Sequence, residues 1–577
     1  MEKKRIFEKK LMTLIGGIVL VATPVLIVSS CSLTKTTHYV DDQISGLKEV
    51  FNPDSDQNEA LKKLVADIRK ADPTKPENKA KQELLDQKTI LITAGGKIND
   101  KSFHQSAWEA ISKFSKEIGN NDNNFYETKA VSDDQQFDAY DYALKKGFKV
   151  WVLIAFTQEN LLGKWLSKGK NLERFKASNI KIVAVDWFPS QESNNGIFNQ
   201  IEGNLLGINF KTQEAAFVAS YAAAKLFSEI NQSDPKLFPS EKTFFNSFGG
   251  DDFSAITNFN YGFYEGMRQF NEDSIFKKWN YLVRSNSPIE LNTGFNLTLD
   301  GKAKVEREID GGPKKEVPQI IFPVAGALAS AAIDRVQNKN SNQWIIGIDS
   351  NQALAYPANK ESLLTSVEKK VGVAVYKALL TLYQLDGYDS SEHLSLLPKN
   401  YGLNEQNQII NKSTGQLENY NALNGYSEGF ANVSKSTLNP NLKLSDGTTY
   451  AQRYDQIVAN TWDTFFGNEE KKIIGRFNLE KNQTDQDGFK GLKPTTDEIK
   501  NFNKAMSNWP DNILKDENGN ELSDEEKIKR LQENIKTVTS LKNVLYGFMT
   551  AKNKINYFEP MINIINQQKS KTRLNDH

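Results

Sequence analysis

Cysteine is almost absent from this sequence, whose 577 residues contain only Cys31. A single thiol excludes an internal disulfide and cysteine-based metal or redox chemistry. The four histidines are His38, His104, His393 and His577, and neither an H-E-x-x-H nor a C-x-x-C pair accompanies them. Because a catalytic zinc site needs several such ligands brought together, we expect no metal and no cofactor.

An excess of charge is also missing, since 72 Lys and Arg balance 72 Asp and Glu. A balanced chain gives no reason to expect nucleic acid as a partner. No G-x-S-x-G elbow is present, so His104 is interpreted as a rim residue rather than a general base. The adjacent acids Asp251 and Asp252 are ordinary turn chemistry and do not establish a glycosidase pair. The sequence therefore favours a protein that is not an enzyme.

The N-terminus has the layout of a bacterial secretion signal. Basic residues precede an apolar run from Leu11 to Val28, and Cys31 follows directly after small residues. An uncleaved transmembrane anchor is the alternative, because about 18 apolar residues lie near the lower limit for spanning a bilayer. The cysteine resembles that of a lipobox. We therefore expect a lipoprotein signal peptide over residues 1–30 and a lipid such as palmitate on Cys31, which would anchor the protein at the extracellular face of the cell membrane.

Composition divides the rest of the chain into three segments. Residues 31–87 are polar and charged and are interpreted as a tether with some helix around Glu59 to Lys70. Residues 88–466 alternate between strand-like and helix-like patterns. Residues 467–577 carry acidic and polar clusters between short helical patterns, which indicates a helical C-terminal extension.

One cluster in the extension, "DENGNELSDEE", resembles a calcium-binding loop. Its Gly519 comes too early for the turn that such a loop needs. We expect instead a turn followed by a helix-capping box from Ser523 to Glu526.

The central segment has near-continuous apolar runs of strand length between helical patterns. Parallel strands that are buried on both faces have this composition. The alternation predicts an α/β fold with doubly wound parallel sheets, and its length predicts two lobes. The expected strands cover residues 89–93, 150–156, 180–186, 243–248, 319–324 and 344–349, and the expected helices cover 212–226, 258–270 and 326–337.

A glycine-rich stretch, "TAGGKINDKSF", runs from Thr93 to Phe103 after the first strand. It has neither the Walker A spacing nor the third glycine of a dinucleotide fingerprint, so it is not a phosphate loop. Ser102 and Gln105 predict a capping box and a helix that begins at or near Phe103. Phe103 then lies beyond the carboxyl end of a strand, where open α/β sheets bind ligands; the alternative is a phenylalanine that only caps the core.

The stretch "GGKINDKSFHQSAWEA" resembles the "GG-I-D-D-K-S-F-N-Q-S-A-W-E-G" signature of the basic membrane protein family. These are lipid-anchored, PnrA-type substrate-binding proteins of ABC importers that bind nucleosides. Further similar pieces occur in the same order, and the resemblance covers residues 88–465. They lie at residues 208–224, 344–352, 363–379 and 401–409, and the last of them resembles the final strand of the family pattern.

This resemblance implies a two-lobed periplasmic-binding-protein-like (type I) fold. Two hinged lobes would close on a nucleoside or a related small planar solute, and the closed form would dock on an ABC permease whose separate ATPase drives import. In the carried-over site, Phe103 stacks on the base and Phe295 covers the opposite face. Asp349 accepts hydrogen bonds from ribose hydroxyls, Gly326 lets the backbone approach the sugar, and Lys369 lies at the pocket wall.

In the same resemblance, Asp186 reads polar edges of the base, and Asn99 and Asp100 shape the first loop. The chain departs from the family at Ala94, where an acidic residue is common, and at Asn99, where aspartate is frequent. These changes remove one or two potential hydrogen bonds in the first lobe and leave the exact ligand open. The alternative function is a surface adhesin or antigen that uses the same scaffold.

Overall fold

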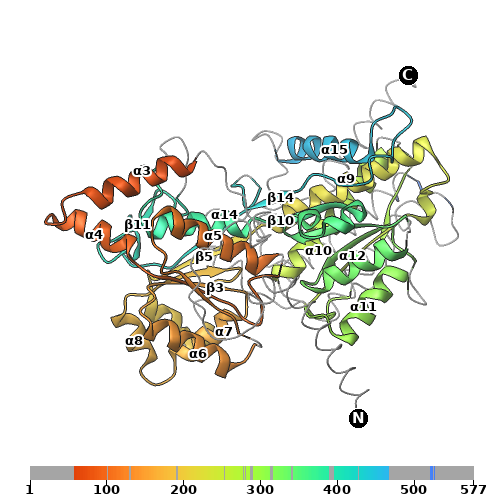
Figure 1. The fold of residues 1–577 in the computed structure, drawn as a ribbon. Coiled ribbons are helices and arrows are strands. Elements are labelled where there is room, and N and C mark those ends of the chain that lie inside the picture. The colour runs from red at the N-terminus through yellow and green to blue at the C-terminus, as the bar shows by residue number, and fades with distance from the viewer. Residues whose placement is uncertain are drawn as a thin grey trace, which may run out of the picture. The chain divides into compact units, whose positions relative to one another are not determined.

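The computed structural model describes residues 57–466 with short gaps, and residues 520, 522, 523 and 526 (Figure 1). The gaps are residues 101, 129–130, 190–192, 252–253, 277–278, 280, 286–289, 312–315, 340–341, 389–394 and 427. The expected signal peptide, Cys31 and most of the expected C-terminal extension lie outside the described residues. The capping box is confirmed, because the Ser523 hydroxyl accepts the Glu526 N–H at 3.3 Å and the Ser523 N–H donates to the Glu526 carboxylate at 3.3 Å.

The chain forms two compact units, and each is built around a six-stranded sheet with helices on both faces. Unit 1 holds the residues up to 208, except 188–191, and residues 371–422. Unit 2 holds residues 209–370 and those from 423 onward, together with the short excursion at 188–191. The chain therefore passes between the units at three places besides that excursion. The expected two-lobed α/β fold class is confirmed.

The sheet of unit 1 has the strand order β13-β5-β4-β3-β1-β2. From β2 through β5, each strand is parallel to its neighbour. Every residue of β1, β3, β4 and β5 is buried, as parallel strands covered on both faces require. The strands are β1 (Thr89–Ile92), β2 (Asn124–Tyr126), β3 (Val150–Ile154), β4 (Lys181–Val185), β5 (Leu205–Phe210) and β13 (Tyr420–Asn424).

Helices cover both faces of this sheet: α5 and α14 lie on one side, and α6, α7 and α8 lie on the other (Figure 1). The α5–α14 contact includes a hydrogen bond from the Gly372 N–H to the Ser106 hydroxyl at 2.9 Å and another from Tyr376 to the buried Glu117. The bounds are α5 (Phe103–Glu117), α6 (Asp133–Lys145), α7 (Gln158–Leu166), α8 (Asn171–Ala177), a 3₁₀ segment η2 (Ser193–Ile201) and α14 (Val371–Leu382).

Within the described residues, the helices α3 (Gln57–Lys70) and α4 (Pro76–Leu85) precede the first strand. The first confirms the helix expected around Glu59 to Lys70, and the second was not expected. Leu61 and Leu85 are almost completely buried, so this part of the expected tether packs on unit 1. Only residues before 57 are left for a plain polar linker, and they lie outside the described residues.

The segment 401–409 contains a strand, as the resemblance implied, but this strand lies outside both six-stranded sheets. It contains β11 (Tyr401–Leu403) and the start of β12 (Ile409–Asn411), which pair antiparallel in a separate two-stranded sheet. The reason is a tight turn: the Asn404 side chain accepts the N–H groups of Gln406 and Gln408, and Asn407 adopts φ +58°.

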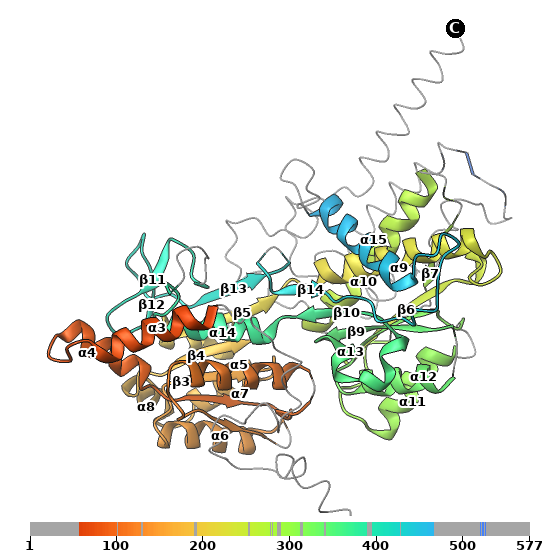
Figure 2. The same ribbon diagram turned by 45° about the horizontal axis from the view of Figure 1, so that its top comes forward.

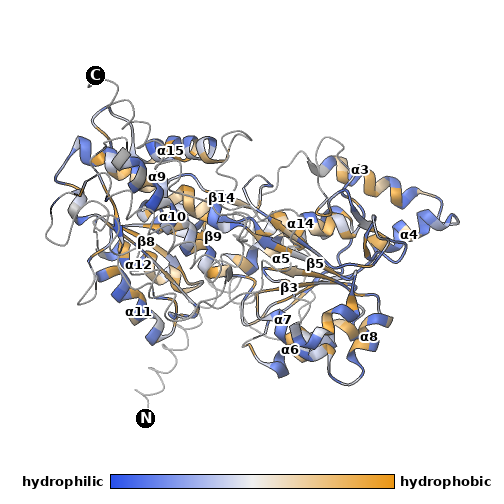
Figure 3. Ribbon diagram, turned by 180° about the vertical axis from the view of Figure 1, so that it is seen from behind, coloured by the Kyte–Doolittle hydropathy of each residue, from blue (hydrophilic) through white to orange (hydrophobic). Residues whose placement is uncertain are grey.

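The sheet of unit 2 has the order β14-β10-β9-β8-β6-β7. In this sheet β14 is antiparallel to β10, and the pairings from β10 through β7 are parallel. Hydrophobic colour is concentrated in the strands, whereas peripheral helices such as α4 and α11 are mostly hydrophilic (Figure 3). The strands are β6 (Phe244–Gly249), β7 (Arg284–Ser285), β8 (Ile320–Val324), β9 (Trp344–Asp349), β10 (Leu363–Lys369) and β14 (Ala431–Val433).

In unit 2, α9 and α10 lie on one face of the sheet with α15 above them, and α11 and α12 lie on the other face (Figure 2). The expected helices within residues 212–226, 258–270 and 326–337 are confirmed, and the first two are longer than predicted. The bounds are α9 (Thr212–Ser233), η3 (Ser240–Lys242), α10 (Ser254–Phe276), α11 (Leu299–Asp310), α12 (Leu328–Lys339), α13 (Gln352–Ala355), η4 (Pro357–Ser362) and α15 (Tyr450–Phe465).

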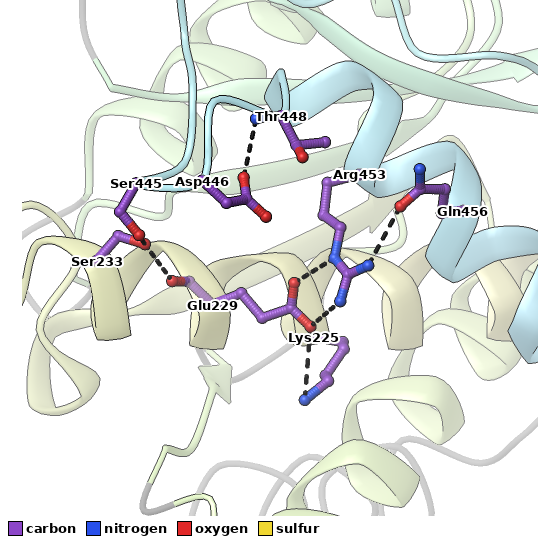
Figure 4. A network of polar contacts seen from close by, with 8 residues as sticks. All are labelled: Lys225, Glu229, Ser233, Ser445, Asp446, Thr448, Arg453 and Gln456. Atoms are coloured by element: carbon purple, nitrogen blue, oxygen red, sulfur yellow. Dashed lines mark hydrogen bonds and ion pairs between the residues drawn. The ribbon is translucent and has the colours of Figure 1, made fainter.

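Helix α15 is fastened to α9 by a polar network (Figure 4). The Arg453 guanidinium donates to both carboxylate oxygens of Glu229, at 2.6 and 3.0 Å, and Lys225 lies 3.7 Å from the same carboxylate. On the apolar side, the rings of Trp462 and Tyr426 stack with their centroids 3.6 Å apart and an angle of 9° between their planes. Residues 434–466, which follow β14, are therefore an integral part of unit 2.

Candidate functional site

Both sheets place their first strand between the second and the third, in the orders β2-β1-β3-β4-β5 and β7-β6-β8-β9-β10. In such sheets the connections diverge beside the first strand, and ligands bind outside the carboxyl ends there. Five residues at or shortly after the carboxyl ends of strands have positive φ: Gly95 (81°), Ala155 (95°), Asp186 (67°), Gly326 (54°) and Asp349 (61°). Left-handed backbone is costly for residues other than glycine and gathers at functional sites, so these turns mark the candidate site in each unit.

The loop after β1 is pinned by the neighbouring strand β2. The Gly95 N–H donates to the Thr128 hydroxyl at 2.9 Å, and the Ile98 N–H donates to the Glu127 carboxylate at 2.7 Å. Burial raises the pKa of Glu127, although this hydrogen bond and the positive charge of Lys97 oppose the effect. Because the loop is held at both Gly95 and Ile98, its path into α5 is defined.

Helix α5 begins at Phe103 as predicted, but the predicted capping box of Ser102 and Gln105 was wrong. The described side chain of Ser102 accepts no N–H from the helix, and Gln105 bonds to Glu109 instead. The cap is Asp100, whose carboxylate accepts the N–H groups of Ser102, His104 and Gln105 at 2.9, 3.0 and 3.1 Å. The chain turns back so that Asp100, two residues before Ser102, reaches the N–H groups at the start of the helix.

Asp100 also contacts His104, since the imidazole Nδ1 lies 2.7 Å from its carboxylate. Burial by itself raises the pKa of Asp100, but the hydrogen bonds and charge of His104 and the backbone N–H donors outweigh burial and hold the pKa below its usual value. The carboxylate therefore stays ionised and keeps the helix start in place. Asp100 shapes the loop, as expected.

Phe103 is half-buried, whereas the apolar residues on its own face of α5 are fully buried: Ala107, Ala110, Ile111, Phe114 and Ile118. The aromatic ring is thus set apart from the core that the rest of this face fills. Asn99 is half-buried beside the cap. Asp186 is half-buried at the end of β4, where its N–H donates to the Ile208 carbonyl at 2.8 Å.

Ala94, which stands where the family commonly has an acidic residue, is buried. The structure instead supplies a carboxylate from the adjacent strand end, Glu127. Sequence reasoning missed Glu127 because β2 spans only three residues, "NFY", and gave no strand signal. Ala155 was missed as well, because nothing in a lone alanine predicts a left-handed turn.

In unit 2, Phe295 packs among glycines of two strand-end turns. A Cβ added to Gly250, after β6, would overlap the Phe295 ring, and one added to Gly326, after β8, would lie 3.5 Å from Phe295 Cδ1. Both glycines leave room that the aromatic ring occupies. The structure therefore brings Phe295 and Gly326 together.

Asp349 and Lys369 end the neighbouring strands β9 and β10. The Lys369 ammonium lies 3.8 Å from the Asp349 carboxylate, 3.5 Å from the Ala255 carbonyl oxygen and 5.1 Å from the centroid of the Phe259 ring. The Lys369 side chain is 4% exposed and that of Asp349 is 15% exposed. A buried cation thus lies beside a carboxylate that keeps some access to solvent.

The predicted residues therefore gather at the carboxyl edge of each sheet. Unit 1 holds Asn99, Asp100, Phe103 and Asp186, and unit 2 holds Phe295, Gly326, Asp349 and Lys369. Within the part of the chain that the structure describes, no group of three or more His, Cys, Asp or Glu could hold a metal ion. Among the same residues, no helix is long and apolar enough to cross a membrane.

Comparison with known proteins gives a family match and distant relatives. A model of the family described as "ABC transporter substrate-binding protein PnrA-like" matches residues 87–277 and 304–407. Basic membrane protein A of Borreliella afzelii is 24% identical over 322 residues, which cover 55% of this chain and 80% of that protein. "ABC transporter nucleoside-binding protein BmpA" of Lactococcus lactis subsp. cremoris is 23% identical over 330 residues, which cover 54% of this chain and 78% of that protein.

Among solved structures, an ABC transporter solute-binding protein of Aeropyrum pernix K1 is similar at 18% identity, with a TM-score of 0.45, over 73% of this chain and 99% of that chain. The matched residues of the family model leave out 278–303, which contain Phe295, and everything after 407, which includes α15.

Proposed function

This chain belongs to the PnrA-like family of ABC transporter substrate-binding proteins, and on that premise we propose that it binds a nucleoside or a closely related planar solute for import. The family consists of substrate-binding proteins and not enzymes, in agreement with the sequence analysis. The relative from Lactococcus lactis is named a nucleoside-binding protein, which supports this class of solute.

The observation that carries the proposal is the presentation of Phe103. Phe103 is the first residue of α5 and lies beyond the carboxyl end of β1, beside which the connections of the sheet diverge. The Asp100 cap fixes the backbone at this helix start. An aromatic side chain that is kept out of the core at such a place offers a flat face to a base. Asn99 and Asp186 would supply polar contacts to the edges of the base.

Unit 2 would supply the contacts to the sugar. Asp349 would accept hydrogen bonds from ribose hydroxyls, because its carboxylate keeps some exposure while Lys369 balances its charge. Gly326 would allow a close approach of the backbone at the start of α12, and Phe295 would cover the second face of the base. Ala94 replaces an acidic residue of the family. Glu127, whose carboxylate reaches the same loop from the end of β2, would take over recognition of the solute in unit 1.

In the proposed importer, a lipid on Cys31 anchors the chain at the extracellular face of the membrane. Closure of two hinged lobes on the solute allows docking on a permease, and a separate ATPase supplies the energy. The alternative is a surface adhesin or antigen on the same scaffold, with the expected C-terminal extension, residues 467–577, as its contact surface.

The test is a thermal-shift panel of nucleosides and free bases, followed by calorimetry on the best binder. Phe103→Ala should weaken binding by the loss of a stacking contact, about 1 to 3 kcal/mol or roughly 5- to 150-fold. Phe137→Ala is the matched control, since Phe137 is also half-buried but lies on α6 beneath Lys168. Unchanged affinity in Phe103→Ala would remove the assignment of the stacking residue, and a panel without any binder would favour the adhesin.

A further inference from the structure

The ring of His104 lies over the backbone of Gly96. A Cβ added to Gly96 would fall within the His104 imidazole, with Cε1, Nε2 and Nδ1 as its nearest atoms. The His104 side chain is only 14% exposed. Gly96 has no left-handed φ that would explain it, so the space for this ring is the physical reason for a glycine at position 96.

The same imidazole contacts the other parts of the turn. Its Nδ1 lies 2.7 Å from the Asp100 carboxylate that caps α5. Its ring meets the Phe103 ring edge to face, with centroids 5.4 Å apart and planes at 84°. His104 therefore touches the loop before the cap, the cap itself and the aromatic ring that the cap presents.

The imidazole of His104 carries a cost in folding stability. An ionised carboxylate can only accept, so Nδ1 carries the proton toward Asp100, and in the neutral ring Nε2 is an acceptor. Among the described residues Nε2 is buried and has no hydrogen-bond partner. A buried polar atom without a partner costs free energy.

We propose that His104 is a positioning residue for Phe103: by filling the space above Gly96 and bonding Asp100, it fixes the turn and the orientation of the stacking ring. The inference rests on the proposed function for its consequence, tighter binding of a planar solute. The contacts themselves are independent of any ligand. Gly96 and His104 form one interlocked pair, so changes at the two positions are expected to be strongly coupled.

The first experiment uses no ligand. Hydrogen exchange of the segment 94–107 is measured in the wild type, Gly96→Ala, His104→Ala and the double variant, with Gly387→Ala as control because an added Cβ there meets nothing within 4 Å. Each single variant should speed exchange of the amides capped by Asp100 by about tenfold or more. The double variant should be no faster than His104→Ala. Fully additive effects would overturn the interlock.

The second experiment separates positioning from simple support. With inosine as the probe, His104→Ala should lower affinity about tenfold while the melting temperature stays within about 2 °C. His104→Asn, which keeps a donor for Asp100, should recover part of the loss, and His104→Leu should not. A changed melting temperature with unchanged inosine affinity would overturn the positioning role. If the wild type binds no nucleoside, the proposed function fails, and the exchange measurements still decide whether His104 fixes the turn.

Discussion

The ammonium nitrogen of Lys369 lies 3.8 Å from Oδ1 of Asp349, at adjacent strand ends of unit 2. Because the lysine is nearly buried and the carboxylate is partly exposed, the pair combines a structural charge with a group that can still bind a ligand. The two roles can be separated by substitution.

We predict that Asp349→Asn lowers nucleoside affinity by about 10- to 100-fold, the range for hydrogen bonds to a charged acceptor. It also removes a negative charge close to buried Lys369 and should cost about 1 to 3 kcal/mol of stability. Adding Lys369→Met should restore the stability and not the affinity. Calorimetry and urea unfolding check both parts, and full affinity in Asp349→Asn would exclude this carboxylate as a ligand.

Lys181 is predicted to make the protein more stable as the pH rises from about 7. Burial lowers the pKa of this lysine from 10.5 to about 7, although its ammonium donates to Asn179 and Asn204 at 2.6 and 2.9 Å. Between those pH values the unfolded chain binds more protons than the folded one, so folding gains on the order of 2 kcal/mol from pH 7 to 9.

In Lys181→Met this contribution is absent, so its stability relative to wild type should be highest at pH 6 to 7 and should fall toward pH 9. The comparison cancels the titration of all other groups, such as the buried tyrosines. Parallel pH profiles of the two proteins in chemical denaturation would show that the ammonium is not destabilised by burial.

The contact between α9 and α10 is predicted not to tolerate a methyl group at Gly262. An added Cβ would overlap the Gln213 carbonyl oxygen, which is backbone and cannot turn aside. Overpacking of this kind costs about 1 to 3 kcal/mol. Gly262→Ala should lower the melting temperature, while Gly387→Ala should not. An equal melting temperature for both variants would contradict the close contact.

Helix α15 is predicted to contribute more stability through Trp462 than through Arg453. Trp462 is 4% exposed and stacks on Tyr426, so Trp462→Ala should cost about 3 to 5 kcal/mol. Arg453→Met loses a partly exposed ion pair with Glu229 (Figure 4) and should cost about 1 kcal/mol or less. Guanidinium unfolding measures both changes, and the reverse order would show that the polar network dominates.

The strands that sequence reasoning found are those buried on both faces, such as β3, whose five residues are all apolar and inaccessible. Strand β10 was not recognised, because "LLTSVEK" mixes polar residues into the run. Its polar groups are satisfied by another segment: the Thr365 hydroxyl donates to the Ser434 carbonyl, and the Ser366 N–H donates to the Ser434 hydroxyl at 2.8 Å. A partner 68 residues away cannot be seen in local periodicity.

The candidate site shows the same division. The motif and its place after the first strand pointed to Phe103, and the resemblance to the family pointed to Asp186 and Asp349. Glu127 could not be predicted from the sequence, because its carboxylate reaches the loop after β1 only through the pairing of β2 with β1. The position of Phe295 beside Gly250 and Gly326 likewise depends on the packing of loops that are far apart in the chain.

By itself, the sequence determined where α5 begins, since a strand, two glycines and a run of helical spacing leave one place for the turn before Phe103. Only the tertiary structure decided how that turn is held. The cap is Asp100 and not Ser102, and Gly96 is small because His104 lies above it. The direction of a side chain after a turn depends on the path that Thr128 and Glu127 impose on the loop, and no local pattern encodes that path.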